Sequence, residues 1–176
     1  MPPTLRRLLV TTATLAIALT AIGCGCSRGE RIAPLEVTIT RSPNLSGELV
    51  PIALYAVSDA TAAEWVGRGA QPAATLTREG GSGRFSERAV KRIYLTVDGA
   101  DSKTLTRDDP VWRRWGDARG RRLVAVANVG ARNPNDRAAI SIDACDWRDG
   151  PRTLQLAVDE SGLRIYSRGG REVAGR

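Results

Sequence analysis

Few residues of this 176-residue chain have the type and spacing that catalysis requires. The sequence contains no histidine, which excludes from these residues a Ser-His-Asp triad, a Cys-His pair and a histidine proton shuttle. Asp143, Asp146 and Asp149 recur at every third position before Gly150. An EF-hand loop places its calcium ligands at alternate positions, so this spacing predicts turn and capping carboxylates. We therefore expect no catalytic residue, no metal and no cofactor.

A second cluster combines arginine with tryptophan. Its members are Arg113, Arg114, Arg119, Arg121 and Arg122, with Trp112 and Trp115 nearby. Guanidinium groups beside aromatic rings suit phosphate, lipopolysaccharide or nucleic acid. At helical spacing, however, both tryptophans fall on one face with Val111, and Arg113 and Arg114 fall on the opposite face. We therefore interpret the tryptophans as core anchors and the arginines as a solvated helix face, with a patch for an anionic ligand as the alternative.

The basic residues reach well beyond this cluster. The formal net charge is +7, carried by 24 arginines and 2 lysines. A basic surface attracts anionic headgroups and polyanions even without a dedicated site. Arginine is spread evenly between residues 28 and 176, so the net charge by itself identifies no partner.

The first 23 residues predict a secretory signal peptide. Arg6 and Arg7 precede 15 uncharged residues, positions 8–22, which is short of the roughly 20 that a spanning helix needs. Residues 21–24 (Ala-Ile-Gly-Cys) resemble the bacterial lipobox, which implies that Cys24 carries lipid and becomes the new N-terminus. Cys26 fits less well, because Gly23 would then occupy the position that usually holds leucine. A plain signal peptide or a short anchor without lipid is the alternative.

This resemblance implies a membrane-bound protein. A lipoprotein cysteine carries a diacylglyceryl group and an N-acyl chain, and stable anchoring takes about two such chains. Gly25 stands where an aspartate would retain a lipoprotein in the inner membrane, so we expect an outer-membrane anchor with a periplasmic or surface-exposed domain. Nucleic acid is not expected as a partner there. The compartment permits disulfides, so Cys26 and Cys145 either form a bond from tether to domain or remain two thiols.

The remaining chain divides into a tether at residues 24–33, a domain at 34–168 and a polar tail at 169–176. Within the domain, short apolar runs alternate with turn residues, which is typical of a β-sandwich. The predicted strands include residues 35–40, 49–57, 92–97, 123–129, 138–142, 154–158 and 163–165. Residues 49–57 and 123–129 are apolar on both faces, which predicts central strands. A turn at 160–162 predicts a hairpin between the last two.

Two segments have the helical period instead. Residues 59–67 place Ala62, Trp65 and Val66 on one arc. The tryptophan-containing helix opens at Asp108-Asp109-Pro110, where an acidic cap and a proline are good start signals. We expect both helices to cover a sheet or its edge. The fold prediction is thus a mostly β protein: a single antiparallel β-sandwich, transthyretin- or Ig-like, of seven or eight strands with two short helical insertions.

The order of these elements carries a family resemblance. After the lipobox and a first strand, a two-faced strand ends in Tyr55-Ala56-Val57-Ser58-Asp59 before a helix, and further strands lead to a final hairpin. Over about residues 35–166 this order resembles the small outer-membrane lipoprotein of the type VI secretion system. The resemblance implies a transthyretin-like sandwich that tethers a membrane complex by contacting an inner-membrane protein. The chain departs from the pattern of this family at residues 109–115 and 132–136.

Two classes of function follow. The first is a non-catalytic interaction or scaffolding lipoprotein with an envelope protein as partner, in a secretion-type membrane complex or another envelope assembly. The second is an envelope hydrolase that uses Asp and Glu carboxylates, or a binder of anionic envelope glycans. The missing histidine and the lack of any nucleophile motif favour the first class.

Overall fold

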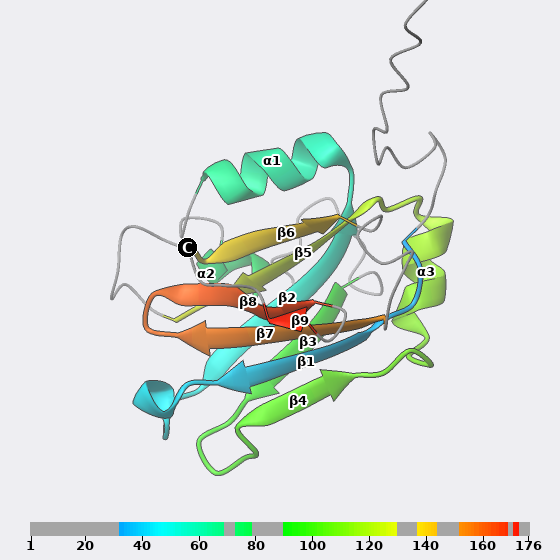
Figure 1. Ribbon diagram of the computed structural model, residues 1–176. Helices are drawn as coiled ribbons and strands as arrows, with labels where there is room; N and C mark the ends of the chain where they lie inside the picture. The colour runs from blue at the N-terminus through cyan, green and yellow to red at the C-terminus, as the bar shows by residue number, and fades with distance from the viewer. Residues whose placement is uncertain are drawn as a thin grey trace, which may run out of the picture.

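Two β-sheets packed face to face form the centre of the protein (Figure 1). The computed structural model describes residues 32–68, 73–78, 90–129, 137–143, 152–168 and 171–172, so Cys24, Cys26, Cys145, Asp146 and Asp149 lie outside the described residues. The first sheet has the order β4-β1-β7-β8-β9, with β4 (Ser102–Leu105), β1 (Glu36–Arg41), β7 (Thr153–Asp159), β8 (Gly162–Arg168) and β9 (Arg171–Glu172). The second has the order β3-β2-β5-β6, with β3 (Val90–Leu95), β2 (Val50–Val57), β5 (Arg122–Ala127) and β6 (Ala139–Asp143). The predicted mostly β sandwich is confirmed.

One strand pair departs from the antiparallel prediction. β1 and β7 run parallel, with Val37 opposite Leu154 and Ile39 opposite Leu156. A parallel pair needs a long crossover connection. Here that connection includes the whole second sheet, which lies between β1 and β7 in the chain. Each other strand pair among the described residues is antiparallel.

The main core fills the space between the sheets. Alternate residues of β1 and β7, such as Ile39 and Leu156, point inward against Ile52 and Leu54 of β2 and Leu123 of β5, and all are buried. Each such side chain contributes roughly 1.5–3 kcal/mol by leaving water. This burial explains why the polar residues of β1 and β7 occupy the other alternate positions.

A second apolar cluster covers the outer face of the second sheet. The helices α1 (Asp59–Gly67) and α2 (Ala73–Leu76) supply Trp65 and Leu76 to this cluster. Tyr55 of β2 meets Trp65 edge to face, with ring centroids 4.9 Å apart, and its hydroxyl donates a hydrogen bond to the carbonyl of Leu76. β2 and β5 are the two central strands of the second sheet, as their two-faced apolar runs predict. Each contributes buried residues to the clusters on both faces of the sheet.

The helices lie where the sequence places them, with one error in the buried face. α1 has the predicted bounds, and its N-cap residue Ser58 accepts a hydrogen bond from the Thr61 backbone N–H at 3.3 Å. Ala62 and Trp65 are buried, but Val66 is 42% exposed, so the buried face of α1 is narrower than the predicted arc. α3 (Val111–Asp117) begins directly after Pro110, and Asp109 Oδ1 accepts from the Val111 N–H at 2.9 Å.

Several elements differ from the predictions. The sequence did not predict α2, the short 3-10 helix η1 (Pro43–Leu45) or the polar edge strand β4. β3 starts at Val90 and ends before Val97, which is 52% exposed. β9 lies within the expected polar tail and pairs with β8. Ile32, expected in the tether, is buried in the main core, so the packed domain already includes this residue. No helix among the described residues is long and apolar enough to cross a membrane.

Candidate functional site

The best-defined candidate site is the surface around α3. Beneath it, Val111, Trp112 and Trp115 are buried in the main core. The two indole rings meet edge to face with centroids 4.8 Å apart, a favoured arrangement of aromatic pairs. Trp112 Nε1 donates a hydrogen bond to the carbonyl of Thr106 at 2.8 Å. The prediction that both tryptophans are core anchors is confirmed, and they fix α3 to the domain.

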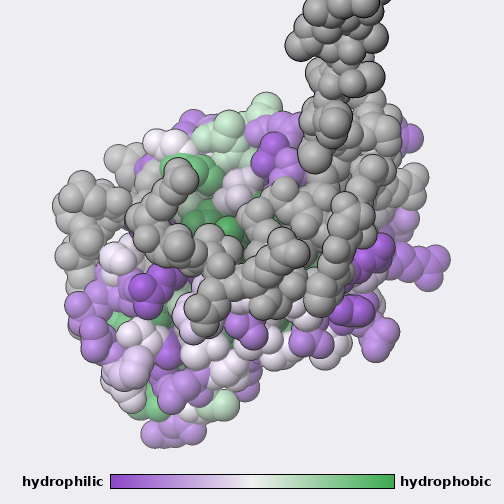
Figure 2. All heavy atoms as spheres, viewed as in Figure 1, coloured by the Kyte–Doolittle hydropathy of each residue, from purple (hydrophilic) through white to green (hydrophobic). Residues whose placement is uncertain are grey.

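Three exposed arginines lie on α3 and just after its end, on the side that faces away from the buried tryptophans. Arg113 and Arg114 lie on the helix, and Arg119 follows its end with a positive φ of 54°. The N–H of Gly120 donates to the carbonyl of Trp115 and that of Arg119 to Gly116, each at 3.1 Å, which is the Schellman pattern of helix termination. We call Arg113, Arg114 and Arg119 the α3 arginine face. Hydrophilic side chains project from this end of the molecule in Figure 2.

The other two arginines of the predicted cluster belong to a separate network of ion pairs. Arg122 Nε lies 2.7 Å from Asp59 Oδ1, and Arg121 Nη1 lies 3.4 Å from Asp59 Oδ2. Arg122 also contacts Asp143 at 3.1 Å. The hydrogen bond from Arg122 and the charges of both arginines hold the pKa of Asp59 below its usual range against partial desolvation. This network ties the first residue of α1 to β5 and β6, so the predicted patch of five arginines is divided.

The chain enters the domain beside the end of α3. The backbone N–H of Ile32 donates a hydrogen bond to the carbonyl of Gly120 at 3.2 Å, and the first described residues run alongside α3 in Figure 1. Gly120 fits closely here, because an added Cβ would lie 2.4 Å from Ala56 Cβ. Sequence patterns could not predict this juxtaposition, since Ile32 and Gly120 are far apart in the chain.

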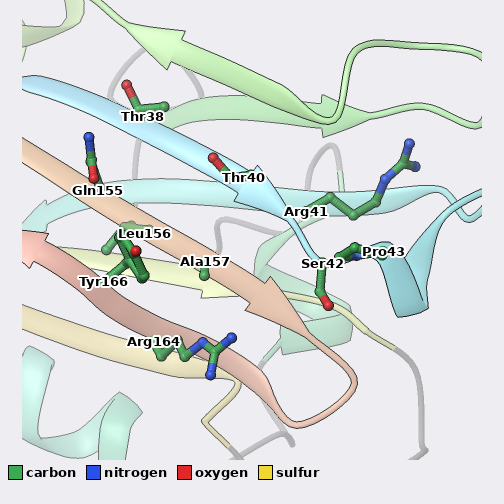
Figure 3. A pocket seen from close by; sticks show the side chains of 10 residues that line it. All are labelled: Thr38, Thr40, Arg41, Ser42, Pro43, Gln155, Leu156, Ala157, Arg164 and Tyr166. Atoms are coloured by element: carbon green, nitrogen blue, oxygen red, sulfur yellow. The ribbon is translucent and has the colours of Figure 1, made fainter. Parts of the chain in front are cut away.

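A second candidate site is a hollow of about 330 Å³ on the outer face of the first sheet (Figure 3). Its lining includes Thr38 and Thr40 of β1, Gln155 of β7, and Arg164 and Tyr166 of β8. This site was not predicted from the sequence, although these residues are the polar or exposed positions of alternating strands. Hydroxyl, amide and guanidinium groups beside a phenol ring can hydrogen-bond to and stack against a sugar. The lining residues include no carboxylate.

Two carboxylates in the described part of the chain have shifted pKa values, and both shifts are downward. Desolvation acts to raise the pKa of Asp109, but hydrogen bonds from Lys91 and the Val111 N–H, with the charges of Lys91 and Arg114, lower it overall. A general acid needs a raised pKa near the working pH. In the structure Asp59 is ion-paired with Arg121 and Arg122, and Asp109 caps α3 and pairs with Lys91. The described residues contain no group of three or more potential metal ligands.

Comparison with solved structures gives several similar folds. The chain is similar to Lip of Serratia marcescens, a membrane-bound component of the type VI secretion system, with 13% identity, a TM-score of 0.44, and coverage of 76% of this chain and 99% of that one. It is similar to the lipoprotein TssJ1 of that system from Pseudomonas aeruginosa, with 23% identity, a TM-score of 0.42 and coverage of 77% and 97%. The chain is also similar to a chain of a type VI membrane complex, with 14% identity, a TM-score of 0.49, and coverage of 78% of this chain and 100% of that one. No protein-family description and no curated protein matches the sequence.

Proposed function

We propose that this protein is a lipid-anchored envelope protein whose β-sandwich is a non-catalytic interaction module. The observation that carries the proposal is the order of Arg6 and Arg7, the uncharged residues 8–22 and the lipobox-like residues before Cys24. Ile32, eight positions after Cys24, is already part of the packed core. A short tether between an acylated cysteine and a folded domain is the arrangement that this proposal requires. The anchor is proposed to lie in the outer membrane.

The proposed role is to tether a membrane complex of the type VI secretion kind by contact with another envelope protein. The support is the sequence resemblance in the order of elements and at residues 55–59. Tyr55 of that stretch packs on Trp65 of α1, and Asp59 pairs with Arg122 of β5. The residues that carry the resemblance therefore join the sheet to the helical insertion.

The anchor is tested by metabolic labelling with a fatty-acid analogue in a diderm bacterium. Cys24→Ala should abolish labelling, whereas Cys26→Ala and Cys145→Ala, the matched control variants, should retain it. Loss of label in Cys26→Ala alone would move the anchor to Cys26. Label retained in all three variants would contradict lipidation at either cysteine.

The interaction module is tested by crosslinking in intact cells followed by mass spectrometry. A specific envelope protein, recovered with the parent chain and lost when another lipoprotein replaces the domain, supports the proposal. If that protein belongs to no secretion complex, the anchored module stands and the secretion role is wrong. Cleavage of an envelope glycan by the purified protein would contradict the non-catalytic proposal.

The hollow on the first sheet favours binding of an envelope glycan as a second candidate function. Tyr166 is 50% exposed there and lies beside Gln155 and Arg164. Titration with peptidoglycan fragments should show binding that Tyr166→Ala removes. Tyr94→Ala is the matched control, because Tyr94 is also exposed but belongs to the other sheet. Equal binding by both variants would reject this candidate.

A further inference from the structure

We propose that the α3 arginine face docks onto the anionic phospholipid headgroups of the membrane that holds the lipid anchor. The domain would then lie on the bilayer with α3 toward the headgroups and with the hollow of the first sheet and the α1 surface left accessible. This inference rests on the proposed lipidation of Cys24, and it adds an orientation and a second membrane contact.

The tether is short and joins the domain beside the arginine face. Eight residue steps from Cys24 to Ile32 can span at most about 29 Å. Ile32 is held at Gly120 by a backbone hydrogen bond, and Gly120 directly follows Arg119. The seven residues of α3 extend over only about 10 Å. The whole arginine face therefore lies close to the point where the tether joins the domain, and the tether can bring it to the bilayer surface.

The surface of α3 beside the tether is positively charged. Arg113, Arg114 and Arg119 are exposed, and Arg107 is an exposed neighbour at the approach to α3. Among the described residues 107–120, the exposed carboxylates are Asp108 and Asp117, which leaves an excess of positive charge on this segment. Asp109, near Arg114, is already paired with Lys91. Arginine binds phosphate through several donors in a fixed fork, and anionic lipid headgroups present phosphate at the surface.

The arginine face stands on a rigid helix. The rings of Trp112 and Trp115 hold α3 against the core, and the Schellman hydrogen bonds fix the backbone at Arg119. The arginine face therefore exists before docking, and the binding cost is limited to ordering side chains. The acyl chains at Cys24 would by themselves keep the protein at the membrane, so the basic patch is needed only to set how the domain lies on the bilayer.

The experiment measures the position of the lipidated full-length mature protein on supported bilayers by neutron reflectometry. On phosphatidylcholine containing phosphatidylglycerol, the protein density should touch the headgroup layer. On phosphatidylcholine alone, and on the anionic bilayer in about 1 M salt where screening acts within roughly 3 Å, the domain should stand off by up to the tether length. In the triple variant Arg113→Ala, Arg114→Ala, Arg119→Ala, the ratio of docked to lifted protein should fall by about fivefold for each arginine, on the order of 100-fold in total.

Matched variants separate the arginine face from net charge. The triple variant Arg68→Ala, Lys103→Ala, Arg164→Ala removes the same charge from exposed positions elsewhere and should stay docked. Lysine at the three α3 positions should also retain docking. The inference is overturned if the parent stands off on the anionic bilayer, if the α3 variant stays docked, or if both alanine variants lift equally. Failure of the lipidation proposal looks different, because protein would then be missing from both bilayers. The salt series on the parent chain tests docking even if a variant does not fold.

Discussion

Arg41 is buried, with 2% of its side chain exposed, whereas the side chain of its ion-pair partner Asp101 is 66% exposed. Arg41 Nη2 lies 2.6 Å from Asp101 Oδ1, and Nη1 donates hydrogen bonds to the carbonyls of Glu48 and Thr96 at 2.7 and 3.2 Å. Glu48 precedes β2 and Thr96 follows β3, and both strands belong to the second sheet. Since Arg41 ends β1 of the first sheet, its guanidinium joins the two sheets at one end of the sandwich.

This asymmetry predicts unequal effects of the two substitutions. Arg41→Met should lower the free energy of unfolding by roughly 2–3 kcal/mol, because two backbone acceptors lose a charged donor. Asp101→Asn should cost about 1 kcal/mol or less, because an exposed carboxylate contributes little and the amide oxygen still accepts. Urea unfolding measures both. Equal losses would show that the Asp101 charge, and not the two carbonyl contacts, accounts for the contribution of Arg41.

The tryptophans of α3 should be among the most sensitive positions for stability. Trp112→Ala or Trp115→Ala should cost roughly 3–5 kcal/mol, a large share of the 5–15 kcal/mol of a typical domain. Trp112→Phe should cost less than Trp112→Ala, because it keeps an aromatic ring in the core and loses only the hydrogen bond to Thr106 and part of the ring contact. Thermal unfolding measures these effects, with the exposed Tyr94→Ala as control. Melting temperatures within a degree or two of the parent for both alanine variants would contradict their role as core anchors.

The sequence predicts those parts of the fold in which burial repeats with a regular period. β7 and β8 form the predicted hairpin, and α1 has its predicted bounds. These predictions succeed because positions that are buried at a period of 2 or 3.6 residues hold apolar residues, and this period can be read from the sequence. β4 was missed because its burial pattern contains only one buried residue, Leu105. The parallel pairing of β1 with β7 was missed because periodicity identifies a strand but not its neighbour.

The candidate site was predictable only as a set of residues. Helical spacing correctly separated Trp112 from Arg113. Nothing in the spacing indicated that Arg122 reaches Asp59, 63 positions away, at 2.7 Å. The hollow on the first sheet depends on the small Ala157 beside Arg164 and Tyr166, which become neighbours only through the register of β7 and β8.

Asp109 should make stability sensitive to acid. Its pKa is lowered in the folded protein relative to an unfolded value of about 3.9. Its contribution is therefore fully present above that unfolded value and is lost as the pH falls through the lower folded value. In urea unfolding, Asp109→Asn should be less stable than the parent at pH near 6, and the difference should shrink below about pH 4. Asp108→Asn, at an exposed neighbouring position, controls for net charge. A difference that is constant with pH would contradict this assignment.

Two glycines predict opposite responses to the same substitution. Gly162 begins β8 with a positive φ of 108°, and an added Cβ would lie 2.5 Å from the carbonyl oxygen of Arg137. Gly162→Ala therefore combines a disfavoured backbone conformation with a backbone clash, and should cost about 1–3 kcal/mol. Gly116 lies within α3 and has no atom within 4 Å of an added Cβ, so Gly116→Ala should stabilise the protein by up to about 1 kcal/mol.

Urea unfolding measures the change in the free energy of unfolding for both variants, each of which adds one methyl group. The sign should differ because Leu163, next to Gly162, donates its N–H to the same Arg137 carbonyl at 2.7 Å, which leaves the backbone no room to move away. Gly116→Ala also places a residue of higher helix propensity in α3 and leaves the charge of the arginine face unchanged. If Gly162→Ala is neutral, the close approach of Arg137 to β8 is not maintained in solution. If Gly116→Ala is destabilising, α3 does not remain helical through Gly116.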